Sequence, residues 1–155
     1  ECELAVVLGR DARDVPAGQT RDYIFGYTIL NDVSARDVQT AHKQWYFGKS
    51  LDGFTPIGPC IVTADAFADY PPRLGIRSFV NGEKRQDSNT ALQIFDIDHV
   101  IAELSQGMTL KAGTIIATGT PAGVGMGMDP PQFLKPGDVV RCEIEGIGTL
   151  TNPVK

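Results

Sequence analysis

The feature that most constrains the fold of this chain is a series of short apolar runs interrupted by glycine and proline. The 155 residues include 17 glycines and 10 prolines, which separate these runs along the whole chain. Glycine and proline end regular elements, and short runs between them are typical of β-strands joined by turns. The sequence therefore predicts an α+β fold that is mostly β.

The predicted strands share β-branched and aromatic residues between turn residues. They span residues 1–9, 25–30, 59–63, 74–80, 83–87, 114–118, 138–144 and 148–152. Asn81-Gly82 lies between two of these runs and predicts a hairpin with a type I′ turn. The main helix is predicted over residues 96–106, where apolar residues recur at helical spacing before Gly107.

Composition indicates one compact domain and excludes several classes of partner. Hydrophobic residues make up 42% of the chain and charged residues 21%, which is ordinary for a globular protein. The net charge of −5 and the dispersed basic residues argue against a nucleic-acid partner. No apolar run approaches the ~20 residues that span a bilayer, so no membrane partner is expected.

The three cysteines indicate the compartment. Cys2, Cys60 and Cys142 are odd in number and lack the spacing of a metal site. We expect them to be small buried residues in a reducing compartment, which favours a cytoplasmic protein.

Two glutamates open the chain at alternate positions of a predicted strand. Side chains at such positions project from the same face, so Glu1 and Glu3 should point together. A hard divalent cation relieves the repulsion between two carboxylates, and oxygen ligands favour Mg2+, Mn2+ or Ca2+. Most pairs of this kind, however, lie on the solvent face of a half-buried strand, and that alternative stays open here.

A third carboxylate ends the next strand. Asp32 precedes a predicted short helix over residues 34–41, with Asp32 or Ser34 as its N-cap. Arg36 and Gln39 should share one face of this helix. The alternative to a site role is that Asp32 caps the helix and pairs with Arg36 on the surface.

Six stretches of the chain follow one another in a characteristic order. They are residues 1–9, 26–39, 48–59, 80–83, 117–125 and 134–138. The ordered set resembles the fumarylacetoacetate hydrolase family, specifically its C-terminal catalytic domain. The resemblance implies a mixed β-sandwich roll with small helices.

The resemblance also implies a set of site residues. The metal ligands would be Glu1, Glu3 and Asp32, holding Mg2+ or Mn2+, with Ca2+ as a further option. Lys49 would be catalytic, adding positive charge where enolate or carboxylate charge develops. The residues around the substrate would be Arg36, Gln39 and Thr120.

The implied function is that of a metal-dependent enzyme acting on small 2-oxo or β-diketo acids. Such an acid can chelate a metal ion, which then stabilises an enolate. The same chemistry serves C–C bond hydrolysis, decarboxylation and enol/keto isomerisation. The stretch Lys49–Phe54 resembles the bacterial branch that contains hydroxyheptadienedioate isomerases. The alternative is a non-catalytic metal-binding relative that keeps the fold.

Relatives in this family carry upstream sequence, including a lid with a histidine that assists proton transfer. Residues 1–155 are therefore expected to be a single catalytic domain that lacks an upstream lid segment, and the α-amino group of Glu1 would oppose a bound cation. Family members pair through this domain, so a homodimer is expected. The aromatic stretch 45–47 would form the dimer seam or a site wall, or alternatively fill the core.

Other site types fit the sequence less well. The glycine-rich residues 119–127 lack the Gly-Lys-Ser/Thr of a P-loop and the following helix of a dinucleotide-binding fingerprint. The family resemblance implies a substrate-side loop, and the alternative is a flexible surface loop. Residues 126–132 receive no role. A Ser-His-Asp hydrolase is disfavoured because Ser34 lacks a nucleophile elbow, and His42 and His99 are expected to be structural or solvated.

Overall fold

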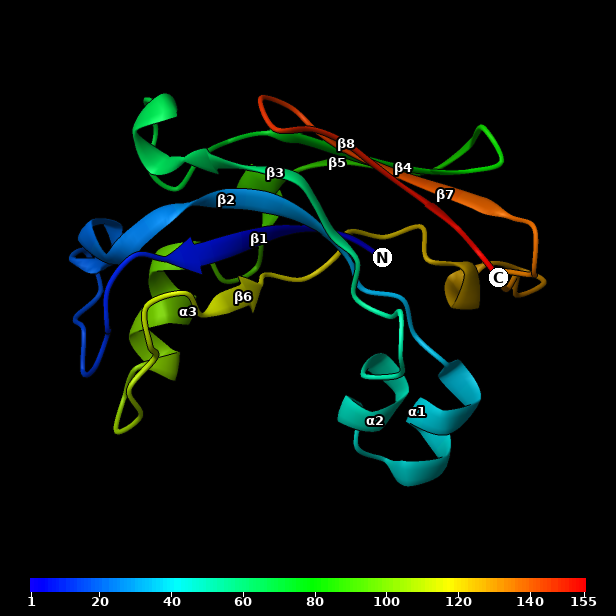
Figure 1. Cartoon of the computed structure of the whole chain (residues 1–155), viewed down its shortest axis with the longest axis horizontal. Helices are drawn as coiled ribbons and strands as arrows, with labels where there is room; N and C mark the ends of the chain where they lie inside the picture. The colour runs from blue at the N-terminus through cyan, green and yellow to red at the C-terminus, as the bar shows by residue number, and fades with distance from the viewer.

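The computed structural model describes residues 1–155 except the side chain of His42, so the role considered for that side chain lies outside the described part. It shows two four-stranded sheets packed face to face (Figure 1). The first sheet has the order β3-β2-β1-β6, formed by Ile57–Thr63, Ile24–Asn31, Cys2–Leu8 and Ile115–Ala117. The second has the order β5-β4-β7-β8, formed by Glu83–Asn89, Gly75–Val80, Val139–Ile144 and Gly148–Pro153.

The helices are short and lie at the margins of the sheets. They are α1 (Arg36–His42), α2 (Tyr46–Lys49) and α3 (Ile97–Leu104), with single 3-10 turns at Thr20–Tyr23, Ala64–Ala66, Thr90–Leu92 and Gly125–Gly127. The prediction of a mostly β sandwich roll is confirmed, and every strand pair described is antiparallel. In Figure 1, α1 and α2 lie together near the start of β1.

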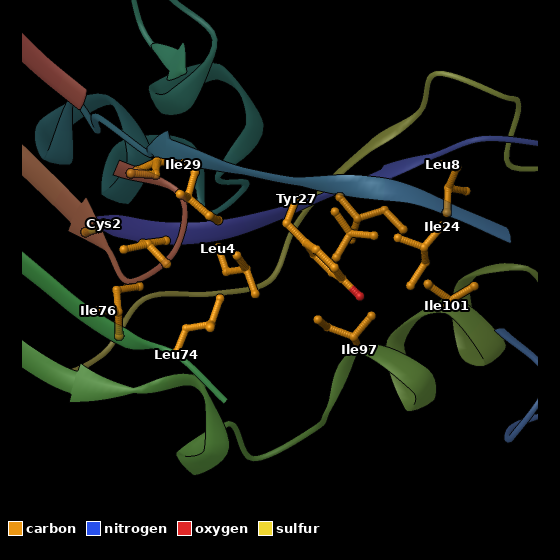
Figure 2. Packing of buried hydrophobic residues seen from close by; sticks show 14 of the residues in the cluster. Cys2, Leu4, Leu8, Ile24, Tyr27, Ile29, Leu74, Ile76, Ile97 and Ile101 are labelled. Carbon is orange, nitrogen blue, oxygen red and sulfur yellow. The ribbon is translucent and has the colours of Figure 1, made fainter. Parts of the chain in front are cut away.

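The core fills the space between the sheets and continues beneath α3. Leu4 of β1, Ile29 of β2 and Ile76 of β4 belong to one buried cluster. Ile97 and Ile101 of α3 extend this cluster at its other end (Figure 2). The helical spacing of these two residues is what allows both to face the sheet.

Strand β1 is buried along its whole length, but its two faces differ. Cys2, Leu4, Val6 and Leu8 face the hydrophobic core. Because strand side chains alternate, Glu1 and Glu3 project from the opposite face. Glu3 is only 4% exposed, so the alternative of a solvent-facing pair is wrong.

The predicted hairpin is also confirmed. Strands β4 and β5 flank Asn81 and Gly82, which have φ angles of 51° and 84°. A type I′ turn requires positive φ at both central positions, and asparagine and glycine tolerate this conformation best.

The predicted cap of the first helix is wrong. Helix α1 begins at Arg36 after Ala35, and no side chain caps its first turn. Ser34 instead donates its hydroxyl to the backbone carbonyl of Asp32 at 3.2 Å, and the Asp32 carboxylate contacts Lys49. The charged partner outweighs the cap because charge-assisted hydrogen bonds are stronger than neutral ones.

Two burial predictions also need correction. Cys2 and Cys142 are buried as expected, but Cys60 is exposed on the edge strand β3. The rings of Trp45 and Tyr46 are 66% and 80% exposed, so they do not fill the core. Among the described residues, no helix has the length and apolar character needed to cross a membrane.

Candidate metal centre and active site

The register between β1 and β2 brings the first and third carboxylates together. Cys2 pairs with Asn31 in this antiparallel ladder, so the next pair along is Glu1 and Asp32. The backbone N–H of Asp32 donates to the carbonyl of Glu1 at 2.9 Å. Residues 31 positions apart in the sequence therefore become neighbours through backbone pairing alone.

Glu1, Glu3 and Asp32 form one cluster at this end of the sheet. One carboxylate oxygen from each lies within 4.8 Å of the others. Ligands of one ion at ~2.0–2.6 Å lie at most about 5 Å apart, so these oxygens fit a shared hard cation. All three donors are carboxylate oxygens, which matches Mg2+, Mn2+ or Ca2+.

Two cations from the helical segment contact the same carboxylates. The ammonium group of Lys49 lies 3.0 Å from one oxygen of Glu1 and also contacts Asp32. The guanidinium of Arg36 pairs with the other oxygen of Glu1. Arg36 thus pairs with Glu1 rather than with Asp32, so the alternative of a surface pair between Asp32 and Arg36 is wrong.

The packing of α2 against α1 places Lys49. A methyl group on Gly48 would lie 2.9 Å from the Ala35 carbonyl and from the backbone nitrogen of Gln39. The N–H of Ala35 also donates to the carbonyl of Gly48 at 2.8 Å. Glycine permits this close approach, and the lysine that follows it reaches the carboxylates.

Gln39 supports Arg36 from inside the same helix. Its side-chain oxygen accepts a hydrogen bond from the guanidinium of Arg36 at 2.8 Å, and the residue is 6% exposed. The predicted sharing of one helical face by Arg36 and Gln39 is confirmed. The contact directs the guanidinium toward Glu1.

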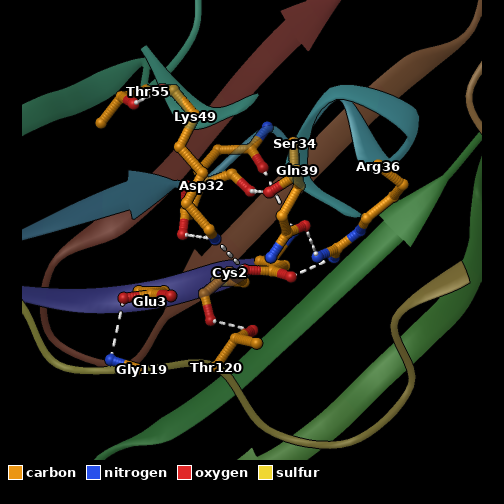
Figure 3. A network of polar contacts seen from close by, with 12 residues as sticks. Cys2, Glu3, Asp32, Ser34, Arg36, Gln39, Lys49, Thr55, Gly119 and Thr120 are labelled. Carbon is orange, nitrogen blue, oxygen red and sulfur yellow. Dashed lines mark hydrogen bonds and ion pairs between the residues drawn. The ribbon is translucent and has the colours of Figure 1, made fainter. Parts of the chain in front are cut away.

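The glycine-rich loop after β6 closes the site from the other side. It continues along β1, where Gly119 donates its N–H to the Glu3 carboxylate at 2.8 Å. Thr120 donates its hydroxyl to the carbonyl of Cys2 at 2.9 Å (Figure 3). The start of the loop is therefore fixed beside the carboxylates.

Burial and neighbouring charges separate the acidities of the three carboxylates. Burial, opposed by the Gly119 N–H and reinforced by Asp32 and Glu1, raises the pKa of Glu3 to about 7. Burial also raises the pKa of Asp32 and outweighs the effect of Lys49. Burial acts in the same direction on Glu1, but its contacts with Arg36 and Lys49 bring the pKa of that carboxyl below its usual value.

Lys49 stays positively charged in this setting. Burial alone would lower its pKa, but the carboxylates of Asp32 and Glu1 raise it overall. Arg36 supplies a second permanent positive charge. The centre can therefore hold a cation between carboxylates and still present positive charge to an anionic ligand.

Two contributors to the site were missed in the sequence. One is the N–H of Gly119. The identity of a residue does not tell where its backbone N–H will point, so the glycine-rich loop was the only signal for this donor.

The other is Asn31, which is 1% exposed. It donates to the side chain of Asn152 on β8 at 3.2 Å, and this contact fixes the end of β2. A polar residue directly before Asp32 was the available signal.

Fold and site together define a protein of the fumarylacetoacetate hydrolase class. The family model described as "Fumarylacetoacetate (FAA) hydrolase C-terminal" matches residues 1–155. The chain belongs to this family.

The chain is similar to individual members of the family over nearly its whole length. The chain is 49% identical over 154 residues to "Oxaloacetate tautomerase YisK" of Bacillus subtilis, a match that covers 99% of this chain and 51% of the relative. It is 52% identical to a solved structure of fumarylacetoacetate hydrolase from Exiguobacterium antarcticum, with a TM-score of 0.96 and coverage of 100% and 55%. It is 48% identical to 5-carboxymethyl-2-hydroxymuconate delta-isomerase from Mycobacterium smegmatis, with a TM-score of 0.88 and coverage of 99% and 57%. The chain thus spans about half the length of these relatives.

Proposed function

We propose that this domain carries a divalent-metal-dependent isomerase site that interconverts keto and enol forms of small 2-oxo acids. The observation that carries the proposal is the convergence of Glu1, Glu3 and Asp32 beside Lys49. The names of the Bacillus and Mycobacterium smegmatis relatives, a tautomerase and an isomerase, support isomerisation over the hydrolysis and decarboxylation that the same centre could serve. Because these relatives are about twice as long as the chain, the activity of the whole protein is part of the proposal.

Each residue has a proposed task. Glu1, Glu3 and Asp32 would hold Mg2+ or Mn2+, with Ca2+ as a further candidate, and a bound ion of this kind polarises a keto oxygen and favours the enolate. Lys49 places a fixed ammonium group where negative charge develops on the substrate oxygen.

The remaining residues bind and orient. Arg36 holds Glu1 in place and offers its guanidinium to a substrate carboxylate. Gln39 orients that guanidinium from within the helix. Thr120 lies on the loop across β1, where its backbone can approach the substrate.

The test uses the full-length protein and the enol form of oxaloacetate, whose ultraviolet absorbance falls as the keto form appears. Turnover should require Mg2+ or Mn2+ and should disappear after chelation. Asp32→Asn should lower it by more than the ~10–100-fold typical of residues that only support a metal ligand. Glu103→Gln removes an exposed carboxylate of α3 and serves as the matched control.

Other results would assign the site differently. If CO2 is released faster than the enol form disappears, the site is that of a decarboxylase. If an acyl group is released faster than the enol form disappears, the site is that of a hydrolase. Tight Mn2+ binding without isomerisation, decarboxylation or hydrolysis of oxaloacetate would indicate a non-catalytic metal-binding relative.

We also propose that the protein is a homodimer and that Trp45 and Tyr46 lie at the seam. Both rings are largely exposed on the segment that leads to Lys49. Aromatic residues are favoured in the buried centres of interfaces, and a specific dimer should bury at least ~1,000 Å2 in total.

A further inference from the structure

Gln86 lies in the second sheet and contacts β1, the strand of the first sheet that carries Glu3. It lies on β5 and is 2% exposed. Its side-chain oxygen accepts the backbone N–H of Cys2 at 3.0 Å. Its side-chain nitrogen donates to the hydroxyl of Thr120 and to the carbonyl of Pro121, each at 2.8 Å. One buried amide therefore touches both the strand that carries Glu1 and Glu3 and the loop that faces them.

These contacts close a ring. The N–H of Cys2 donates to Gln86, the amide of Gln86 donates to Thr120, and the hydroxyl of Thr120 donates to the carbonyl of Cys2. Strand β6 pairs with β1 only as far as Ala5 and Ala117. Cys2 pairs with Asn31 of β2 on one side, and on the side of β6 the ring takes the place of a strand partner.

Cys2 lies between Glu1 and Glu3 in the sequence, so the ring fixes the backbone that carries both carboxylates. A rotation of the peptide on either side of Cys2 would move Glu1 or Glu3, because each is attached to it directly. The ring also commits the Thr120 proton to the Cys2 carbonyl. A hydroxyl has one proton to donate, so Thr120 cannot give it to an anionic ligand at the same time.

The loop after Thr120 is held by the same strand. A methyl group on Gly123 would lie 2.0 Å from the backbone carbonyl of Arg85, so only glycine allows this approach. The guanidinium of Arg85 donates to the side chain of Gln132 at 2.6 Å and also reaches the sulfur of Met128. Neighbouring residues of β5 thus fix both the beginning and the far part of the loop.

We propose that Gln86 is a positioning residue that holds the Glu1–Glu3 segment and the Thr120 loop in one register. The inference rests on the proposed function, because it takes these carboxylates as cation ligands. Gln86 acts through Cys2 and Thr120 and does not itself touch substrate or ion. The Thr120 hydroxyl is part of the same brace, and the backbone of the loop is what faces the ligand.

The first measurement is Mn2+ binding by calorimetry on the full-length protein, followed by binding of oxalate, a planar dianion that chelates a metal ion. Gln86→Met keeps the volume of the side chain but breaks the ring. It should raise the Mn2+ dissociation constant by about tenfold or more, the lower end of the range for residues that support metal ligands. Gln93→Met is the matched control, because Gln93 holds Thr118 of the same loop but does not reach Cys2. Its Mn2+ dissociation constant should stay within about threefold of wild type.

A double-mutant cycle separates the ring from general loosening of the fold. Thr120→Val breaks the same ring at another member, so the combined Gln86→Met/Thr120→Val variant should bind Mn2+ no more weakly than the weaker single variant. Thr120→Ser retains the hydroxyl and should restore binding. Additive losses, or a Thr120→Ser variant as weak as Thr120→Val, would overturn the proposal.

The role of Gln86 in metal binding can be distinguished from a failure to fold and from a lack of turnover. If Gln86→Met does not fold, Thr120→Val decides, since it breaks the same ring from the side of the loop. It should raise the Mn2+ dissociation constant by about tenfold or more, and an Mn2+ affinity within about threefold of wild type would contradict the inference. If wild-type protein binds Mn2+ and oxalate but turns over no oxo acid, the proposed function fails while the role of Gln86 is still tested.

Discussion

The backbone N–H of Gly119 lies 2.8 Å from a carboxylate oxygen of Glu3. This is a favourable contact for the ionised carboxylate, yet burial dominates and the pKa of Glu3 is raised to about 7. Glu3 is therefore the carboxyl of the cluster most affected by pH near neutrality. The loop after β6 thus contributes a backbone donor to the most deeply buried carboxylate of the cluster.

This pKa predicts how cation binding depends on pH. Below pH ~7 Glu3 carries a proton that a bound cation must displace, whereas above it the carboxylate is already free. The apparent association constant for Mn2+ should fall by up to about tenfold per pH unit as pH drops below 7 and should level off above it. Calorimetry in two buffers of different ionisation enthalpy should detect proton release at pH 6 and little at pH 8. An affinity that is flat from pH 5.5 to 8 would contradict the assignment of Glu3.

Lys49 should matter more for turnover than for binding of the cation. Lys49→Met removes the ammonium group that would stabilise charge developing on the substrate, so kcat should fall by about a hundredfold or more. The Mn2+ dissociation constant should change far less. Lys111→Met removes an exposed lysine paired with Asp11 and serves as the control. Near-normal turnover of the Lys49 variant would rule out the catalytic role.

Gly48→Ala should disturb the site through packing. The added methyl group would lie 2.9 Å from the Ala35 carbonyl and from Gln39, so α1 and α2 must separate. We expect a loss of about 1–3 kcal/mol in the free energy of unfolding, typical of overpacking, together with a fall in turnover because Lys49 moves. Gly127→Ala is the control, since its methyl group would approach only Val124, at 3.9 Å. Chemical denaturation of both variants checks the prediction, and equal stability of the two would refute it.

The proposed homodimer can be tested through its aromatic residues. Full-length protein should sediment as a dimer at micromolar concentration. Trp45→Ser should raise the dimer dissociation constant at least tenfold, because aromatic residues often dominate interface energies. Ile94→Ser changes another exposed apolar residue, 93% exposed, and should leave the dimer intact. A monomer mass for the unaltered protein would exclude the dimer.

Local sequence signals were sufficient for much of the fold. The Asn81-Gly82 hairpin and the helix near residues 97–104 follow from turn chemistry and hydrophobic spacing, and both are found. The cap of α1 was mispredicted for a physical reason. Asp32 has the side chain of a good N-cap. Lys49, which lies 17 residues further along the sequence, offers it a stronger, charged partner.

The sequence by itself determined that the chain is mostly β, that Glu1 and Glu3 share one face of a strand, and that Asp32 ends the next strand. These are consequences of strand alternation and turn residues, which act over a few positions. The tertiary structure alone decided that Arg36 pairs with Glu1, that Gly119 supports Glu3, and that Gln86 of the second sheet braces Cys2. Such contacts depend on strand register and on the packing of two sheets, which bring together residues up to 121 positions apart. No local pattern encodes them, because backbone donors and buried amides acquire their partners only when the sheets close.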